Sequence, residues 1–327
     1  REQEELYMIL KSAISFMMTL VLVLVCMPKF ITYMKKLSIR QSISEYSLEE
    51  DQKKAGTPIM GGILFILIPI LVTLVVHYEV LTDPKTMIVI LAFAGYGCIG
   101  FIDDYLIAVK KNNDGLKPKY KLLMQLVLGV VFFYIYSRIA ELELVWPITH
   151  HVSHLGFFYF LLVLVMFSGS SNAVNLTDGM DGLSSGCSII ALFAFAVISV
   201  LEQQFGIMVL IINIIAGLFG YLYYNKKPAQ VFMGDTGSLA LGGLLAALAM
   251  VLHKEIALIF IGGIFVLDTL SVIIQISSVK LRHKKVFIYT PIHFAFRIKG
   301  MPETQVVHMF WFVEAILAGI GLLLAIL

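Results

Sequence analysis

The segment Asn172-Ala-Val-Asn175-Leu-Thr-Asp178-Gly-Met-Asp181-Gly182 lies between two apolar runs, each about twenty residues long and typical of a membrane-spanning helix. It contains two asparagines, two aspartates and two glycines, but no lysine or arginine. Acidic side chains at a membrane are costly unless a cation or a polar ligand compensates them. Because Asn172, Asn175 and Asp178 recur every three residues, one helix face would present all three. We therefore expect a ligand site here, with a simple polar cap between two spans as the alternative.

The composition is that of a helical membrane protein. Of the 327 residues, 59% are hydrophobic and 14% are charged, and the mean hydropathy is +0.90; soluble domains are about half apolar and a quarter charged. The apolar runs are too long for barrel strands, so the expected fold class is all-α and polytopic. The net charge of +2 is too small to suggest a nucleic-acid partner. The cysteines lie in apolar runs without the spacing of a disulfide or zinc site: Cys26, Cys98 and Cys187.

The distribution of basic residues predicts the orientation of the chain. The loops after spans one, three, five, seven and nine hold 6, 5, 0, 2 and 6 lysines and arginines, which is 19 of the 24. The positive-inside rule places these loops in the cytoplasm and both termini outside. We expect one transmembrane catalytic domain over residues 1–327, with cytoplasmic loops at 28–57, 106–121, 172–184, 225–237 and 277–307. The ten predicted spans are residues 6–27, 58–78, 86–105, 122–139, 155–173, 185–201, 207–224, 237–252, 256–276 and 308–326.

Acidic residues recur at the cytoplasmic ends of these spans. Asp103 and Asp104 close the third span, where a carboxylate opposes the helix dipole unless a cation compensates it. Adjacent helix residues point about 100° apart, so only one of the pair would face a site directly. Asp235 follows the seventh span in a glycine-rich segment, and its carboxylate is a hard oxygen ligand suited to Mg²⁺. The residues expected to converge at this face are Asp103, Asp104, Asp178, Asp181, Asp235 and His293.

Basic residues near these acids indicate a phosphate-containing ligand. Lys226 and Lys227 precede the segment of Asp235, and acids interleaved with lysines suit a Mg²⁺-bridged diphosphate. Lys54, beside a Gly-Thr-Pro turn, and Lys121, at the start of the fourth span, are the other candidates for contact with phosphate or nucleotide. Ordinary positive-inside charge explains most of the remaining lysines. Two further residues are expected near the site: Asp268, which would support it from within the ninth span, and Arg297, which would pair with phosphate or lipid headgroups.

Two patterns imitate functional motifs. Gly95-Tyr-Gly97-Cys-Ile-Gly100 fits the dinucleotide-binding pattern, but it lies within a membrane span with no strand before it, so we interpret it as helix packing. His150, His151 and His154 lie in an outer loop, and we do not expect a metal there.

The motifs resemble those of the phospho-N-acetylmuramoyl-pentapeptide transferases, a branch of the polyprenyl-phosphate N-acetylhexosamine-1-phosphate transferases. The resemblance extends from about Lys54 to the last span. The segments that carry it are Gly56 to Gly62, Phe101 to Tyr105, Asn172 to Gly182, Phe232 to Gly243 and Thr269-Leu-Ser-Val.

This resemblance implies a ten-helix enzyme of the bacterial cytoplasmic membrane, usually a homodimer, with Mg²⁺ as cofactor. Such enzymes transfer phospho-N-acetylmuramoyl-pentapeptide from its uridine diphosphate (UDP) carrier to undecaprenyl phosphate, in peptidoglycan synthesis. The products are lipid I and uridine monophosphate (UMP). The resemblance implies that Asp235 binds Mg²⁺ and that Asp103 is the candidate base. It further implies that Asp104 and Asp178 support the metal and diphosphate, and that the uridine pocket is formed by Lys54, Asp181, Asn225 and Phe232, the last by stacking.

The chain departs from the family pattern at His293. The family reads Pro-Ile-His-His-His-Phe-Glu, and this chain reads Pro291-Ile-His-Phe-Ala-Phe-Arg297, so two histidines and the acid are replaced. Ile59 also replaces a usual threonine. A sister enzyme that uses UDP-N-acetylglucosamine is therefore the main alternative. A transporter would place its polar groups near the bilayer midplane, and a purely structural membrane protein would not need five acids at one face.

Overall fold

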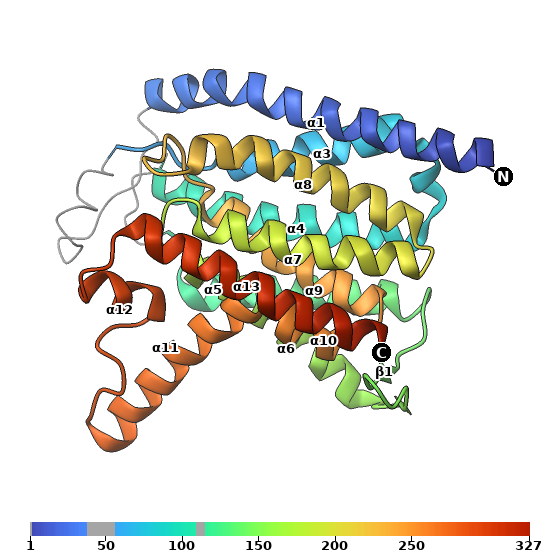
Figure 1. Ribbon diagram of the computed structural model, residues 1–327. Coiled ribbons are helices and arrows are strands. Elements are labelled where there is room, and N and C mark those ends of the chain that lie inside the picture. Colours follow the sequence, from blue (N-terminus) through green and yellow to red (C-terminus); the bar gives the residue numbers. More distant parts are fainter. Residues whose placement is uncertain (1, 38–55, 109–114) are drawn as a thin grey trace.

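The computed structural model describes residues 2–37, 56–108 and 115–327, and most of them are helical (Figure 1). A two-stranded antiparallel ribbon pairs Leu144 with Ser153. In chain order the elements are α1 (Glu2–Lys36), α3 (Gly62–Val76), η1 (Tyr78–Thr82), α4 (Pro84–Ala108), α5 (Pro118–Tyr136), β1 (Leu144–Val145), β2 (Val152–Ser153), α6 (Phe157–Thr177), α7 (Leu183–Leu201), α8 (Phe205–Asn225), α9 (Gly234–Val251), α10 (Glu255–Ile261), α11 (Gly263–Arg282), α12 (Ile292–Ile298) and α13 (Glu303–Ile326).

The helices confirm a polytopic all-α membrane protein. Within the described residues, 9 helices are long and apolar enough to cross a membrane. The shorter apolar helix α3, with 15 residues, takes the place of the predicted second span. The start of α1 and the end of α13 lie at the same end of the bundle in Figure 1, as an even number of spans requires.

Helix α9 forms the centre of the bundle. Every side chain from Thr236 to Val251 is buried, and α4 and α6 are its main neighbours. Small residues allow this close packing, since a Cβ added to Gly242 would lie 2.3 Å from the carbonyl oxygen of Ser170 in α6. The outer helices α1, α5, α11 and α13 instead expose most of their apolar side chains, as lipid-facing helices do.

The glycines of α4 pack against other helices, which confirms the interpretation of the false dinucleotide motif. A Cβ on Gly95 would meet the side chain of Leu128 in α5, and one on Gly97 would meet Ile66 in α3. At Gly100 a Cβ would lie only 2.0 Å from the backbone oxygen of Asp235. This contact brings the C-terminal end of α4 directly against the N-terminal end of α9.

The predicted ninth span differs most from the structure. We expected one helix over residues 256–276, but the chain breaks at Gly262 into the short α10 and the longer α11. The carboxylate of Glu314 in α13 accepts a hydrogen bond from the backbone nitrogen of Ile264, at 2.8 Å, so it satisfies a free donor at the start of α11. Figure 1 shows α11 leaving the bundle at an angle from this break.

Candidate active site

The adjacent aspartates at the end of α4 have different surroundings. Asp104 turns toward α9, where its Oδ1 accepts from the backbone nitrogen of Asp235 at 3.1 Å. Its Oδ2 accepts from the backbone nitrogen and the Oγ1 of Thr236, at 2.9 and 2.6 Å. Three hydrogen bonds to a helix N-terminus stabilise this carboxylate and fix the start of α9. Asp104 therefore fixes the backbone of Asp235 and does not face the site itself. This agrees with the expectation that only one of Asp103 and Asp104 faces the site.

A second cluster joins residues from four helices. Lys121 of α5 lies between two carboxylates, with its Nζ 3.1 Å from Oδ2 of Asp103 and in direct contact with Oδ2 of Asp235. Asn175 of α6 donates from Nδ2 to Oδ1 of Asp235 at 2.7 Å, and to the Oγ of Ser238 at 2.9 Å. The side chains of Lys121 and Asp235 remain 20% and 21% exposed, so solutes can reach them. We call Asp103, Lys121, Asn175 and Asp235 the four-helix cluster.

The four-helix cluster suits a divalent cation shared with a phosphate. The ammonium group of Lys121 already occupies the space between two carboxylates, where a positive charge is favoured. Among the described residues no group of 3 or more His, Cys, Asp or Glu side chains could hold a metal by itself. The protein would therefore supply Asp235, with phosphate oxygens and water completing the shell. Mg²⁺ is usually bound in this way, because it keeps several waters and takes few protein ligands.

Asp181 and Asn225 connect the turn after α6 to the segment before α9. The Oδ2 of Asp181 accepts from the backbone nitrogen of Ala229 at 3.0 Å. The Oδ1 of Asn225 accepts from the backbone nitrogen of Gly182 at 3.1 Å, and its Nδ2 donates to the carbonyl oxygen of Val231 at 3.0 Å. Both side chains are buried. These contacts give Asp181 and Asn225 a scaffolding role, and their predicted contact with uridine stays a prediction.

Three other predicted residues lie around these two clusters. Asn172 donates from Nδ2 to the Oε1 of Gln125 at 2.9 Å, so it joins α6 to α5 and lies outside the four-helix cluster. Asp178 directly follows α6, and its side chain is half-buried. Phe232 is also half-buried and packs against the small apolar cluster of Met34, Ile59 and Met60. Lys54 lies outside the described residues.

His293 lies next to the turn that contains Asp178 and Asp181. Its Nδ1 is 2.8 Å from Oδ2 of Asp268 in α11, and both side chains are fully buried. A Cβ on Gly179 would lie 2.6 Å from Nε2 of His293, so the turn approaches this nitrogen closely. Nε2 has no hydrogen-bond partner among the described residues. Asp268 therefore supports His293 from within the membrane helix, as its position in the sequence suggested.

Comparison with known proteins decides the family. A profile described as "Glycosyl transferase family 4" matches residues 86–253. Proteins named phospho-N-acetylmuramoyl-pentapeptide-transferase from Bacillus anthracis (strain A0248), Bacillus mycoides (strain KBAB4) and Bacillus thuringiensis (strain Al Hakam) are each 44% identical over 302 residues, covering 91% of this chain and 93% of the relative. The chain belongs to the phospho-N-acetylmuramoyl-pentapeptide-transferase family.

The replaced histidines of the family pattern change the surface beside His293. Phe294 stands at the second histidine position, and its ring lies 4.3 Å from the ring of His293. Tyr289 contacts Phe294 edge-on at 5.8 Å, and a Cβ on Gly179 would touch Phe294. This member of the transferase family therefore has aromatic rings packed beside His293 and Gly179, next to the turn that contains Asp178 and Asp181.

The sequence reasoning missed two supporting residues of the transferase. Glu303, at the start of α13, accepts from the backbone nitrogen of Asp181 at 3.0 Å and pairs with Lys227 at 2.6 Å. Thr236 supplies two of the three hydrogen bonds to Asp104. Glu303 could have been noticed as the first acid after a long basic stretch, whereas nothing in the sequence singles out Thr236.

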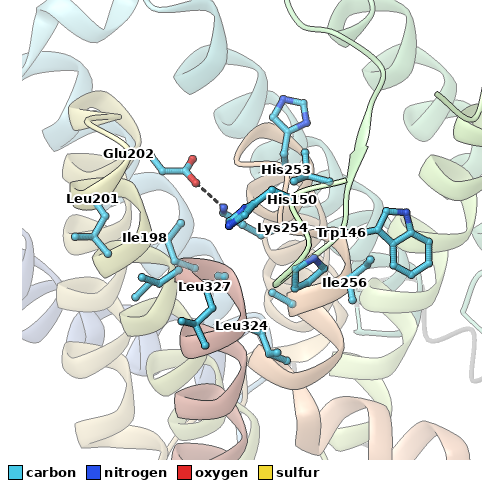
Figure 2. Close-up of a pocket in the computed structure, with 15 residues that line it drawn as sticks. Trp146, His150, Ile198, Leu201, Glu202, His253, Lys254, Ile256, Leu324 and Leu327 are labelled. Carbon is cyan, nitrogen blue, oxygen red and sulfur yellow. Dashed lines mark ion pairs between the residues drawn. The ribbon is translucent and has the colours of Figure 1, made fainter. Parts of the chain in front are cut away.

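A pocket at the opposite end of the bundle is separate from this site. Figure 2 shows it between the ends of α7 and α13 and the start of α10, with His150, His253 and Trp146 around it and an ion pair between Glu202 and Lys254 of 2.7 Å. The 18 residues of α9 separate this pocket from Asp235. It therefore takes no part in the chemistry of the four-helix cluster.

Proposed function

We propose that this chain transfers phospho-N-acetylmuramoyl-pentapeptide from its UDP carrier to undecaprenyl phosphate, giving lipid I and UMP. We further propose that it works in the bacterial cytoplasmic membrane as a Mg²⁺-dependent homodimer, with its active site on the cytoplasmic face. The observation that carries this proposal is the four-helix cluster, in which two carboxylates, an ammonium group and an amide converge at one end of the bundle. The names of its relatives support the donor substrate.

The proposed reaction is a displacement at phosphorus. An oxygen of the lipid phosphate attacks the sugar-bound phosphorus of the nucleotide, a new phosphorus–oxygen bond forms, and the bond to UMP breaks. The attacking phosphate is already anionic near neutral pH, so little proton removal is needed, and positioning and charge neutralisation carry most of the catalysis. Mg²⁺ held by Asp235 would neutralise the charge on the diphosphate oxygens.

The other residues of the four-helix cluster have separate roles in this proposal. Lys121 neutralises charge on the phosphates, because its ammonium group lies beside Asp235, which would hold the metal, and beside Asp103. Asn175 orients the carboxylate of Asp235 through its 2.7 Å hydrogen bond. Asp103 stays the candidate base for the lipid phosphate.

An apolar pocket offers a place for the lipid acceptor. It has a volume of about 410 Å³ and lies between α6, α9, α10 and α11. Ala173 and Val174 line it, directly before Asn175 of the four-helix cluster. A polyprenyl chain in this pocket would therefore bring its phosphate toward Asp235.

The test is UMP release by the purified protein in detergent with undecaprenyl phosphate, with and without Mg²⁺. UDP-N-acetylmuramoyl-pentapeptide and UDP-N-acetylglucosamine are offered in parallel. We expect release only from the pentapeptide donor and only with the metal. Release only from the acetylglucosamine donor would assign the chain to the sister activity, which the replaced histidines around Phe294 make the main alternative. Release from neither would contradict both.

A further inference from the structure

The end of α11 and the loop after it form a projecting basic surface, which we define as residues 280–289 and call the basic tip. Figure 1 shows α11 leaving the bundle, so this tip lies apart from the other long helices. No aspartate or glutamate occurs from residue 269 to residue 302, so the local positive charge is not offset in sequence. Four exposed basic side chains lie in the tip and pair with no acid in the part of the chain that the structure describes: Lys280, Arg282, Lys284 and Lys285.

Large apolar side chains alternate with these charges. Leu281 is 82% exposed, and Val286, Ile288 and Tyr289 are 52%, 57% and 49% exposed. Aliphatic, aromatic and basic side chains in one short segment are typical of protein surfaces that lie in the headgroup region of a bilayer. Water alone would not favour this composition, because four large apolar groups would stay hydrated.

The loop of the tip is held in one conformation against α11. The Oε1 of Gln275 accepts from the backbone nitrogens of Val286 and Phe287, at 2.9 and 3.0 Å, and its Nε2 donates to the carbonyl oxygen of Phe287 at 2.9 Å. Ser278 donates from Oγ to the carbonyl oxygen of Lys284 at 2.8 Å. Two side chains of α11 therefore fix the loop, so its basic and apolar groups are presented together.

The rest of α11 indicates what the tip meets. Leu267, Leu270, Ile273 and Ile276 expose about half of their surface each, as a helix in contact with lipid would. A helix that crosses the bilayer on this side brings its basic end to the membrane surface. We propose that the basic tip binds the headgroups of anionic phospholipids and thereby holds α11 in its tilted position.

This anchoring has a consequence for turnover, which rests on the proposed function. Phe265, Val266 and Leu270 of α11 line the apolar pocket assigned to the lipid acceptor. Anionic phospholipid at the tip would hold this wall of the pocket in place. The transferase would then work faster in a bilayer with anionic phospholipid than in a zwitterionic one.

The test counts phosphatidylglycerol molecules bound to the intact protein by native mass spectrometry, from equal mixtures of phosphatidylglycerol and phosphatidylcholine. The tip variant is R282Q/K284Q/K285Q. The matched control is K29Q/K35Q/K36Q, which removes as many exposed charges from the end of α1. A third variant, R282K/K284R/K285R, keeps the charge and changes the side chains. The count needs no catalysis, so it remains informative whether or not UMP is released.

We expect the tip variant to lose phosphatidylglycerol affinity on the order of a hundredfold, since each basic residue near an anionic surface contributes about fivefold. The charge-retaining variant should bind as the native protein does, and the control should lose much less than the tip variant. Equal binding by the tip variant and the native protein would overturn the proposal. Equal losses in the control, a loss in the charge-retaining variant, or an equal loss of phosphatidylcholine would overturn it as well.

Discussion

Asp103 and Asp104 are neighbours in sequence but have separate roles in the structure. Asp104 accepts three hydrogen bonds from the start of α9, whereas Asp103 faces Lys121 at 3.1 Å. A residue that only positions another should affect stability and rate together. A residue that contacts the substrate should affect the rate alone.

Replacing Asp104 by Asn tests the positioning role. The amide has one acceptor oxygen instead of two, so at least one hydrogen bond to Asp235 or Thr236 is lost. Hydrogen bonds to charged groups contribute about 1.5–3 kcal/mol each, so we expect a lower melting temperature together with slower UMP release. Thermal unfolding in detergent measures the first and a coupled UMP assay the second. An Asp104→Asn protein as stable as the native one but inactive would show instead that Asp104 acts on the substrate.

Replacing Lys121 by Met tests the charge that lies between the carboxylates. The variant keeps the aliphatic stem but loses the ammonium group that contacts Asp103 and Asp235. We expect UMP release to fall by about 10²–10³-fold, the usual effect of removing one preorganised electrostatic contact. Lys119→Met is the matched control, because Lys119 is exposed two residues earlier on the same helix. Equal rates in the two variants would contradict the role given to Lys121.

At the scale of elements, the site depends on how closely α4 meets α9. The Gly100 backbone leaves no room for a methyl group against Asp235. We expect Gly100→Ala to lower the free energy of unfolding by about 1–3 kcal/mol and to abolish most activity, since the two helices must separate. Gly319→Ala in α13 is the control, because a Cβ there meets nothing within 4 Å. A Gly100→Ala protein with native stability and rate would contradict this packing account.

The elements also show how far the sequence could predict the structure. Run length predicted most of the spans, but within the described residues the second is the shorter helix α3 and the ninth is broken into α10 and α11. The convergence of Asp103, Lys121 and Asp235 followed from the side of the membrane on which their loops were expected. The break at Gly262 was not predicted, because hydropathy ignored the Gly262-Gly263 pair. The hydrogen bond that stabilises the start of α11 is accepted by Glu314 on another helix. Hydropathy describes how one segment meets lipid, and it contains no information about contacts between distant helices.

The hydrogen-bond partners of single polar side chains could not be predicted from the sequence either. Asn225 and Asp181 were predicted to contact uridine, which stays a prediction. In the structure the Oδ1 of Asn225 accepts from the backbone nitrogen of Gly182, and the Oδ2 of Asp181 accepts from that of Ala229. Spacing alone cannot distinguish a polar group that binds a substrate from one that satisfies a neighbouring backbone group. Asn172 is a third example, since it binds Gln125.

At the scale of the whole molecule, the orientation in the membrane decides which substrate can reach the site. We expect the four-helix cluster to face the cytoplasm, where a nucleotide-linked donor would be made. In a background without native cysteines, His150→Cys should react with a membrane-impermeant thiol reagent in intact cells. Lys284→Cys should react only after the membrane is opened. The reverse pattern would place the cluster outside and contradict the proposed donor.

The central claim is that the four-helix cluster performs the transfer. The most direct measurement is the rate of UMP release from UDP-N-acetylmuramoyl-pentapeptide by Asp235→Asn, compared with Asp83→Asn at the other end of α4. Asp83 caps that helix by accepting from the backbone nitrogen of Lys85 at 3.1 Å, a role that asparagine also fills. We predict a loss of at least about 10³-fold for Asp235→Asn and a native rate for Asp83→Asn. A folded Asp235→Asn protein that releases UMP at the native rate would contradict the claim.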